Sequence, residues 1–334
     1  MPLVSVILPT YNRAEVVLRA VRTVRSQTAT DLELVIVDDG STDDTLAVLA
    51  TVDDPRVRLL PSAHVGVSRA RNQGLAVSRG RWIAFLDDDD EWPPTYLETQ
   101  LAAAHAHPEA VAVYCLTRHF DDHEGRFGDE TPWYSFSGDL FAPMMQRGYP
   151  RPSATLVLRS VLVAVGGFAP DLDVASDCEL LLRIALRGSY AYNGRALVIR
   201  HLHGRNQLST QWERQRDSYW IQASHLRRDI VQRGGYRAWA TWLRWHVGEA
   251  ELAAISTASN AEQGTAAWAA VRRLARALPW SASAMVRPFV IAAFGIRVRR
   301  ALRRWKGVVH RALGSAARED RRDQLSSGEA PYGS

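Results

Sequence analysis

The chain has 334 residues, 46% of them hydrophobic, a length and composition that allow a sizeable core and exclude global disorder. The net charge of +5 is unevenly distributed, since residues 1–209 carry 20 Lys and Arg against 26 Asp and Glu, whereas residues 210–334 carry 21 against 10. An acidic body and a basic tail need separate explanations. Cys115 and Cys178 lack metal-ligand spacing, so we expect two buried thiols in a reducing compartment.

Strands and helices are expected to alternate along the first hundred residues. Apolar runs predict strands at residues 3–8, 33–37, 56–60 and 82–86. Apolar residues at helical spacing predict helices at 14–27, 42–51 and 67–79, with Ser41 or Thr42 as N-cap of the second and Gly80 as the residue that ends the third. This order predicts a mostly parallel sheet with helices on both faces and ligands beyond the carboxyl ends of the strands.

The rest of the chain is less regular. We expect helices at 94–106 and 177–187, strands at 110–116, 154–158 and 196–201, a loop-rich segment at 118–152, and nearly continuous helix from about residue 210. The polar stretch after Gly314 is expected to be disordered. We find neither a secretory leader nor an uncharged apolar run of ~20 residues, which predicts a cytoplasmic protein.

Carboxylates collect at the ends of three predicted elements. Asp38 and Asp39 follow the second strand, residues 87–90 are four consecutive aspartates after the fourth strand, and Asp177 and Glu179 open a helix. Because strand ends on one edge of a sheet converge, we expect these groups to share one cleft. Four adjacent aspartates repel one another unless a cation neutralises some of them, and oxygen ligands suit Mg²⁺ or Mn²⁺.

Each acidic group also has an ordinary structural interpretation. Residues 87–90 can form a solvated acidic turn, and Asp38-Asp39-Gly40-Ser41 is a common sequence for a turn after a strand. A carboxylate such as Asp177 is favoured in the first turn of a helix by the helix dipole. The residues alone leave these alternatives open.

Six motifs follow one another at characteristic spacing: VSVILPTYNR (4–13), LELVIVDDGSTDDT (32–45), GVSRARNQGL (66–75), WIAFLDDDDEW (82–92), GGF (166–168) and SDCELLLR (176–183). In this order they strongly resemble the family 2 glycosyltransferases, over roughly residues 3–209. The resemblance implies a GT-A fold, a Rossmann-like mixed sheet flanked by helices, followed here by a C-terminal helical region.

The resemblance also implies roles for individual residues. Asp39 is expected to hydrogen-bond the base of a nucleotide-sugar donor, and Asp87 to lie near its ribose or sugar. Asp89 is expected to ligate the metal and Asp177 to act as the catalytic base, with Ser176 standing where the family frequently has glutamate. The other expected donor contacts are Pro9, Thr10, Tyr11, Arg71 and Asn72. His203 is similar to a family histidine near the metal or diphosphate, and a purely structural histidine is the alternative.

The implied activity is an inverting transfer of a sugar from a nucleoside diphosphate, expected to be UDP-linked, to an acceptor hydroxyl, with Mn²⁺ or Mg²⁺ as cofactor. Polysaccharide synthesis at the cell envelope or surface is the expected setting. A carboxylate at Asp177 would take the acceptor proton, so no covalent intermediate is needed. The alternatives are a nucleotidyltransferase, disfavoured by the absence of glycine from residues 9–13, and a non-catalytic nucleotide-sugar-binding protein, disfavoured by the aspartates occurring together.

The chain is expected to divide into a catalytic domain at 1–209, a basic helical region at 210–313 and a disordered tail at 314–334. Within the first, residues 1–100 form the expected nucleotide-sugar-binding half and 101–209 the acceptor half. Three aromatic residues of the acceptor half have two open interpretations, stacking on acceptor sugars or packing their own loop: Trp133, Tyr134 and Phe136.

The basic region carries a further hypothesis. Residues 280–313 combine an apolar stretch with clustered arginines, which predicts docking on the anionic inner face of the plasma membrane and suits a glycan or lipid-linked acceptor. A helical layer packed on the catalytic domain and a homo-oligomer interface are the alternatives. Nucleic-acid binding is not expected, since the catalytic half is acidic and no such motif accompanies the charge.

Overall fold

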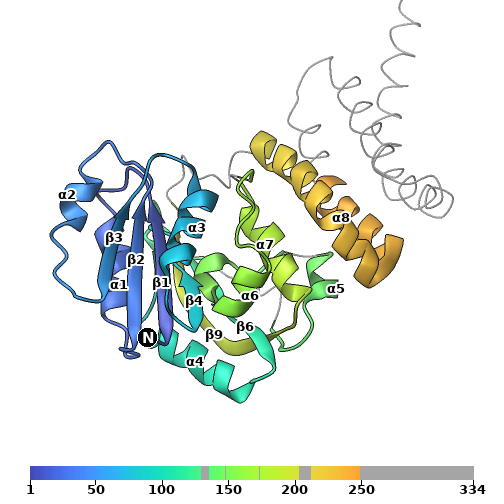
Figure 1. Cartoon of the computed structure of the whole chain (residues 1–334), viewed down its shortest axis with the longest axis horizontal. Coiled ribbons are helices and arrows are strands. Elements are labelled where there is room, and N and C mark those ends of the chain that lie inside the picture. Colours follow the sequence, from blue (N-terminus) through green and yellow to red (C-terminus); the bar gives the residue numbers. More distant parts are fainter. Residues whose placement is uncertain (129–134, 147, 173, 203–211, 249–334) are drawn as a thin grey trace, which may run out of the picture. The chain divides into compact units, whose positions relative to one another are not determined.

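The computed structural model describes residues 1–128, 135–146, 148–172, 174–202 and 212–248 (Figure 1). All of them belong to one compact unit, Met1–Val271. The expected site residue His203, the aromatic pair Trp133 and Tyr134, and the proposed membrane segment 280–313 lie outside the described residues. In the part that is described, no helix is both long and apolar enough to cross a membrane.

The first half of the fold confirms the predicted alternation of strands and helices. Its elements are β1 (Val4–Thr10), α1 (Val17–Arg25), β2 (Leu32–Asp38), α2 (Thr45–Leu49), β3 (Val57–Pro61), α3 (Val67–Val77) and β4 (Trp82–Phe85). These four strands are all parallel and lie in the order β3-β2-β1-β4. The order reverses at β1, so β2 and β4 flank it. In parallel sheets such a reversal leaves a crevice at the carboxyl ends of the strands, where ligands bind.

The second half extends the sheet with both strand directions. Its elements are β5 (Asp90–Glu91), α4 (Tyr96–Ala106), β6 (Ala110–Asp121), β7 (Arg126–Phe127), α5 (Phe141–Met144), η1 (Pro152–Ala154), β8 (Thr155–Leu158), α6 (Arg159–Ala164), α7 (Ser176–Ala185), β9 (Ser189–Leu202), α8 (Trp212–Trp242) and the π-helical η3 (Leu243–Gly248). The order continues as β4-β8-β6-β9-β5, with β7 beside β6. Because β8 is antiparallel to both of its neighbours, the sheet is mixed, as the family resemblance implied.

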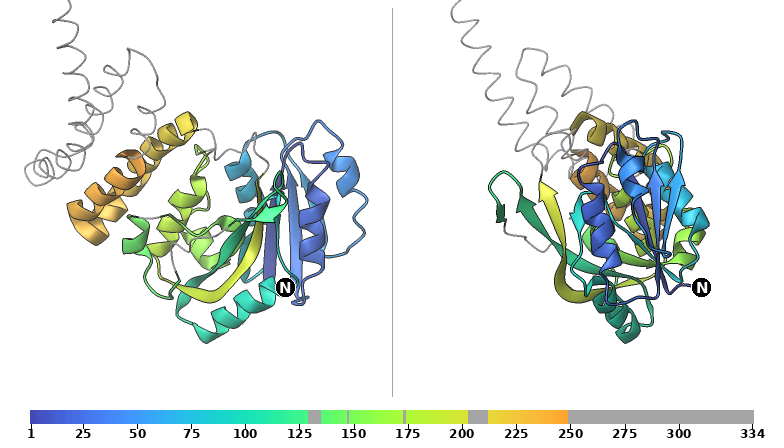
Figure 2. Two further views of the ribbon diagram at one scale, coloured as in Figure 1. Left: turned by 180° about the vertical axis from the view of Figure 1, so that it is seen from behind. Right: turned by 90° about the vertical axis from the view of Figure 1, so that its left-hand side faces the viewer.

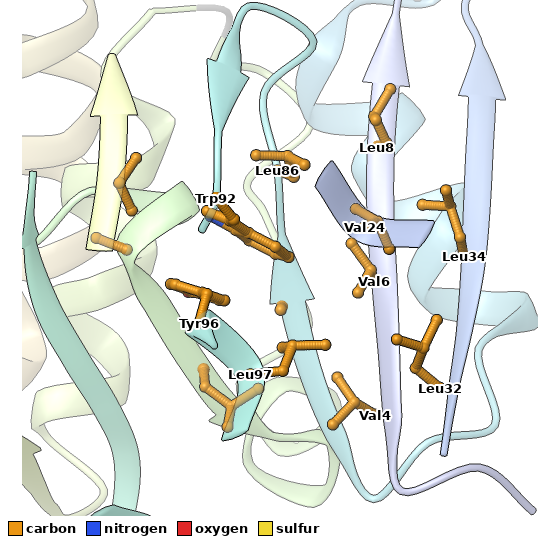
Figure 3. Close-up of a cluster of buried hydrophobic side chains, with 14 of the residues drawn as sticks. Val4, Val6, Leu8, Val24, Leu32, Leu34, Leu86, Trp92, Tyr96 and Leu97 are labelled. Carbon is orange, nitrogen blue, oxygen red and sulfur yellow. The ribbon is translucent and has the colours of Figure 1, made fainter. Parts of the chain in front are cut away.

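The two faces of the parallel strands are covered by different helices. Val4, Val6 and Leu8 of β1 pack in one buried cluster that also contains Val24 of α1 (Figure 3). The intervening positions face the other way, so that a Cβ added to Gly74 of α3 would meet Ile7 and Val37. Side chains alternate between the faces of a strand, and every residue of β1 and β2 is buried. The unbroken apolar runs that predicted these strands follow from this burial on both faces.

The strand β9 bends, and this bend decides where the site forms (Figures 1 and 2). Its pairing with β6 is parallel but shifts register three times, between Ala110 and Thr117 of β6. Such bulges bend strands. The end of β9 also pairs with β5, and only a short loop connects β5 to the central strand β4. The carboxyl end of β9 is therefore brought to the loop that follows β4.

Several local predictions are wrong for identifiable reasons. The N-cap of α2 is Asp44, without a side-chain cap, because Ser41 instead accepts a hydrogen bond from the N–H of Asn12. The first helix begins at Val17 rather than residue 14, and the strand expected at 110–116 continues to Asp121. The short elements β5, β7, α5 and α6 were not predicted, since two to six residues carry no readable periodicity. Both cysteines are free. Cys115 is buried, and Cys178 is partly exposed, although its thiol group is buried.

Gly80 has a different role from the predicted one. The helix α3 ends at Val77, and Gly80 lies against β1, where its N–H donates to Ser5 Oγ at 2.7 Å. A Cβ at this position would lie 2.4 Å from the backbone N of Ser5. The glycine is therefore required by the close approach of two backbone segments and not by helix termination.

We expect Gly80→Ala to destabilise the protein by about 1–3 kcal/mol, because the added methyl must push apart two backbone segments in the core. The measurement is chemical denaturation of residues 1–248 or of the full chain. Gly128→Ala is the matched control, since a Cβ there meets nothing within 4 Å. Equal stabilities of the two variants would contradict the proposed close approach.

Candidate active site

The carboxylate of Asp39 is fixed by backbone donors just beyond the end of β2. The N–H of Val65 donates to Oδ1 at 2.8 Å and that of Gly66 to Oδ2 at 2.9 Å. His64 Nδ1 lies 3.2 Å from Oδ2, and the Asp39 N–H donates to the carbonyl of Thr10 at 2.8 Å. Each carboxylate oxygen has a second lone pair. Asp39 is thus a rigid acceptor at the point where β1 and β2 end.

Pro9, Thr10 and Tyr11, three of the expected donor contacts, differ from one another in exposure. Pro9 and Thr10 are buried, whereas Tyr11 is 39% exposed. The Tyr11 ring stacks on the imidazole of His64, with centroids 4.1 Å apart. Of the three, Tyr11 is therefore the residue whose side chain a ligand can reach. It forms with His64 an aromatic pair beside Asp39.

Thr10 connects the end of β1 to the aspartates that follow β4. Its hydroxyl donates to Asp88 Oδ2 at 2.7 Å, and Arg13 Nε lies 3.7 Å from Asp88 Oδ1. Asp87 is paired with Arg71 of α3, at 2.5 Å between NH2 and Oδ1. Arg19 of α1 donates to the backbone carbonyl of Asp89 at 3.3 Å. Three elements of the first half thus supply cations or donors to this loop.

Ser153 holds the loop from the other side. Its hydroxyl accepts the N–H of Asp87 at 3.2 Å, and its carbonyl accepts the indole N–H of Trp92 at 2.8 Å. A hydrogen bond from the same hydroxyl opposes the rise in the pKa of Asp90. The four aspartates at 87–90, named here the aspartate loop, are therefore packed between β1 and the segment that precedes β8, which excludes the solvated acidic turn.

The electrostatics of this loop match a cation site. Burial, with the charges of Asp89 and Asp87, raises the pKa of Asp88 to about 7, although Thr10 and Arg13 oppose the rise. Burial and the same two charges raise the pKa of Asp90 well above its usual value. One carboxylate oxygen of Asp90 is buried without a hydrogen-bond partner among the described residues. The described cations thus offset the mutual repulsion of the carboxylates only in part, and a hard divalent ion would offset more of it.

The protein side chains described here do not by themselves complete a metal site. Among them, no group of three or more His, Cys, Asp or Glu side chains is arranged to hold an ion. Mg²⁺ is commonly bound by one or two carboxylates together with substrate phosphates and water. The loop therefore fits an ion that arrives with a phosphate-bearing ligand better than an ion in a closed protein cage.

Asn72 and Arg71, neighbours on α3, contact the turn that contains Gly167 and Phe168. The Asn72 amide is held on both sides by Phe168, donating to its carbonyl and accepting its N–H, both at 2.8 Å. The Arg71 guanidinium lies 5.0 Å from the centroid of the Phe168 ring. Gly167 has φ +69°, and a Cβ there would lie 2.4 Å from Asn72 Oδ1. Donor binding by Asn72 stays a prediction, and its observed contacts position the turn that supports Arg71.

Asp177 lies in the first turn of α7, next to the buried Ser176. It lines a small pocket together with Phe85 at the end of β4 and Pro152 before β8. Burial raises the pKa of the Cys178 thiol, and the nearby Asp177 raises it further. Burial also raises the pKa of Tyr219 on α8, with Cys178 and Asp177 adding to the rise. The structure therefore brings Asp177 to the same end of β4 as the aspartate loop.

The helix α8 belongs to the surroundings of Asp177. Gln222 donates to the carbonyl of Ala175, the residue before α7, at 3.0 Å. Arg233 donates to the carbonyl of Ala185 at 3.0 Å and pairs with Asp139 at 2.7 Å. Helical structure from about residue 210 is confirmed for the described part, with an interruption at Gly235. Its packing along α7 places Tyr219 beside Asp177.

The end of β9 contributes a histidine that the sequence did not single out. His201 Nε2 lies 2.7 Å from Glu91 Oε1, and Nδ1 lies 2.7 Å from Asp122 Oδ1. Glu91 also pairs with Arg19 at 3.3 Å. These contacts fix the end of β9 to β5 and to the residue after β6. The signal in the sequence was the segment RHLHGR itself, which pointed to His203 two residues later.

Comparisons with known proteins agree with this geometry. Residues 5–164 match the family model described as Glycosyl transferase family 2. A chondroitin synthase of Escherichia coli is 28% identical over 222 residues, which cover 66% of this chain and 32% of that protein. The chain thus spans about a third of the length of this relative.

Two solved structures share the fold. TarS 1–349 of S. aureus in complex with UDP-GlcNAc has a TM-score of 0.66 at 18% identity, with 84% of this chain and 82% of that chain covered. The mannosyltransferase PcManGT from Pyrobaculum calidifontis, in complex with GDP-Man and Mn²⁺, has a TM-score of 0.53 at 21% identity, with 84% and 81% covered. At these identities the likeness establishes the GT-A-like fold.

We expect Asn72→Ala to destabilise the protein by about 1–3 kcal/mol, because it leaves a buried N–H and carbonyl of Phe168 without partners. Denaturation compared with Gln146→Ala, which removes an exposed amide, measures the effect. If the variant were as stable as that control, the positioning role of Asn72 would be wrong.

Proposed function

Because residues 5–164 belong to Glycosyl transferase family 2, we propose that the chain is an inverting glycosyltransferase that moves a sugar from a UDP-linked donor to an acceptor hydroxyl. The observation that carries the proposal is the clustering of Asp39, the aspartate loop and Asp177 at the carboxyl ends of β2, β1 and β4. Release of nucleoside diphosphate from UDP-, GDP- and dTDP-sugars tests the donor. If none is cleaved with any acceptor, the proposal fails.

The donor side of the proposed site lies at the ends of β1 and β2. Asp39 accepts a hydrogen bond from the base of the donor. The stacked pair of Tyr11 and His64 offers an aromatic surface on which the base can lie. UDP-GlcNAc is the ligand of the similar TarS structure, which supports a UDP-linked donor. Asp87, held by Arg71, faces the ribose or sugar. The pair leaves a cation next to the position where the diphosphate would carry its charge.

Mn²⁺ or Mg²⁺ is the proposed cofactor, with Asp89 as ligand and the predicted His203 outside the described residues. When bound, the ion would stabilise the negative charge that develops on the departing diphosphate. The Mn²⁺ of the similar mannosyltransferase complex supports this choice. The remaining carboxylates and Arg71 hold the loop in place and set the local charge.

The acceptor side lies between β4 and α7. Asp177 takes the proton of the acceptor hydroxyl, and attack from the side opposite the leaving group inverts the anomeric carbon. A nearby cation such as Arg71 adds to the stabilisation of the leaving group. The family match favours this chemistry over nucleotidyl transfer. A non-catalytic binding protein would have no use for a carboxylate placed beside the aspartate loop.

The biological setting extends the proposal. The match to a chondroitin synthase supports a glycan acceptor and polysaccharide synthesis. In the proposed organisation, residues 1–209 form the catalytic domain, and its donor and acceptor halves are divided near residue 100. A basic region at 210–313 and a tail at 314–334 complete the proposed organisation. Docking of residues 280–313 on the inner face of the plasma membrane would bring a lipid-linked acceptor to the site.

We expect EDTA to abolish sugar transfer and Mn²⁺ or Mg²⁺ to restore it, because the aspartate loop and the diphosphate both need a cation. Asp89→Ala should weaken the binding of Mn²⁺ with UDP, followed by calorimetry, while the protein stays folded. Glu98→Ala, at an exposed carboxylate on α4, is the control. Full activity in EDTA would contradict the metal requirement.

We expect Asp177→Asn to lower turnover by about 10²–10⁴-fold, because the amide cannot accept the acceptor proton. The affinity for UDP should change little, since the residue lies on the acceptor side. Turnover and UDP affinity are measured on the same preparation. A product with the anomeric configuration of the donor, followed by NMR, would exclude the inverting mechanism.

A further inference from the structure

Basic side chains from β6 and β9 lie together on one face of the sheet next to the aspartate loop. Arg200 of β9 is the cross-strand partner of His119 on β6 and of Asp90 on β5. Directly opposed residues of paired strands extend to the same face. Arg200 is thus flanked by a histidine on one side and by an aspartate of the loop on the other.

Arg151 approaches the same region from the segment before β8. It precedes Pro152, which lines the pocket of Asp177, and it is two residues from Ser153, which binds the aspartate loop. Its carbonyl accepts the hydroxyl of Thr155 at 2.8 Å, which fixes its backbone. The backbone of Arg151 therefore lies at the junction between the aspartate loop and the pocket of Asp177.

The electrostatic effects of Arg151 show how far its guanidinium reaches. Burial lowers the pKa of Arg200, and Arg151 lowers it further. Burial also lowers the pKa of His119, again with contributions from Arg151 and Arg200. Arg151 also opposes the rise in the pKa of Cys178, the neighbour of Asp177. The Arg151 guanidinium thus influences the pKa values of Arg200 and His119 on β9 and β6 and also that of Cys178 at the start of α7.

Among the residues that the structure describes, Arg151, Arg200 and His119 are compensated to different extents. Asp87, Asp89 and Asp90 raise the pKa of Arg200 and so compensate that side chain in part. For the half-buried Arg151, no ion pair or side-chain hydrogen bond occurs within the described ranges. His119 Nδ1 is buried and lacks a hydrogen-bond partner there as well. A half-buried guanidinium without an ion-pair partner, close to a second guanidinium, favours an anionic ligand.

We propose that Arg151, with His119 and Arg200 beside it, forms an anion-binding subsite for the acceptor, so that the enzyme acts on an acidic glycan. The inference rests on the proposed function, since it gives the acceptor of that site its chemical class. Guanidinium groups bind both carboxylates and phosphates through paired N–H donors, so an acidic sugar or a phosphodiester would fit.

The position of the subsite assigns it to the acceptor. The base and ribose contacts proposed for the donor lie at β1 and β2, on one side of β4. Arg151, His119 and Arg200 lie on β8, β6 and β9 or next to them, on the other side of β4, where Asp177 is also found. An anion held there would lie next to the proposed base and not next to the nucleoside.

Binding to the full chain with UDP and Mn²⁺ present tests the subsite. The probes are a hyaluronan tetrasaccharide, the same tetrasaccharide with its carboxylates reduced to alcohols, and a glycerol phosphate trimer, measured by calorimetry at low and high salt. We expect the wild type to bind one acidic probe at least about 10-fold more tightly than the reduced one, and salt to weaken this preference. Preference for the tetrasaccharide indicates a carboxylate, and binding of the trimer indicates a phosphodiester.

Variants at Arg151 assign the preference to the subsite. Arg151→Gln should remove it, and Arg151→Lys should keep most of it, because the charge remains. Arg22→Gln, at an exposed arginine of α1 with the same charge change, should leave it intact. Arg200 is the poorer choice for substitution, since Asp90 would lose its cross-strand cation.

Three results would overturn the inference. The first is a wild type that binds acidic and reduced probes equally, and the second is an Arg151→Gln variant that keeps the preference. The third is an Arg151→Gln variant whose main defect is weaker UDP binding, which would move the anion to the donor. Cleavage of a UDP-sugar by the wild type is measured in parallel, so that failure of the subsite is distinguished from failure of the proposed function.

Discussion

The crowding of four carboxylates after β4 is the constraint on which the rest of the site depends. At close range, like charges in a partly buried loop raise one another's pKa, and the loop can stay folded only if cations and hydroxyl donors surround it. The structure supplies them from every neighbouring element. They come from the end of β1, from α1, from α3, from the segment before β8 and from β9: Thr10, Arg13, Arg19, Arg71, Ser153 and Arg200. Few of these partners are close to the loop in sequence, so the loop is stabilised by the tertiary fold.

The bend of β9 makes this arrangement possible. A flat sheet would leave the end of β9 far from β4, since β8 and β6 lie between them in strand order. The register shifts against β6 bend the strand until Arg200 pairs with Asp90, and His201 then joins Glu91 to Asp122. Sheet curvature and site electrostatics are therefore two consequences of the same bulges.

The sequence predicts the half of the fold in which β1, β2 and β4 are buried on both faces and β3 lies at the edge of the sheet. Apolar runs and helical spacing were sufficient for β1 to β4 and α1 to α3, because local pattern and burial agree there. The mixed sheet could not be predicted from pattern, since the direction of β8 is set by its two neighbours. Two-residue strands such as β5 exist only because a distant strand pairs with them.

The candidate site shows the same division between local and long-range information. The clustering of aspartates was readable in the sequence, and it marks a packed loop rather than a solvated turn. What each motif residue contacts was not readable. Thr10 faces the aspartate loop, and Asn72 is bound to a turn 96 residues away in sequence. Ser153 and Arg151 stood in no motif, and only the fold brings Ser153 to the loop and Arg151 to the vicinity of Arg200. Motifs therefore identified the neighbourhood, and tertiary contacts assigned the partners.

The charge of the loop has a consequence for how the proposed substrates bind. A nucleoside diphosphate would add negative charge beside carboxylates whose pKa values are already raised by one another. Arg71 can offset part of this charge, but it is already paired with Asp87. In the proposed mechanism the donor therefore binds together with a cation, and each would raise the affinity for the other by the same factor. An anionic acceptor would meet the guanidinium of Arg151, which belongs to the segment between the aspartate loop and the pocket of Asp177. In the proposed reaction both anionic substrates would thus be received by positive charge, the donor by a bound cation and the acceptor by a side chain of the protein.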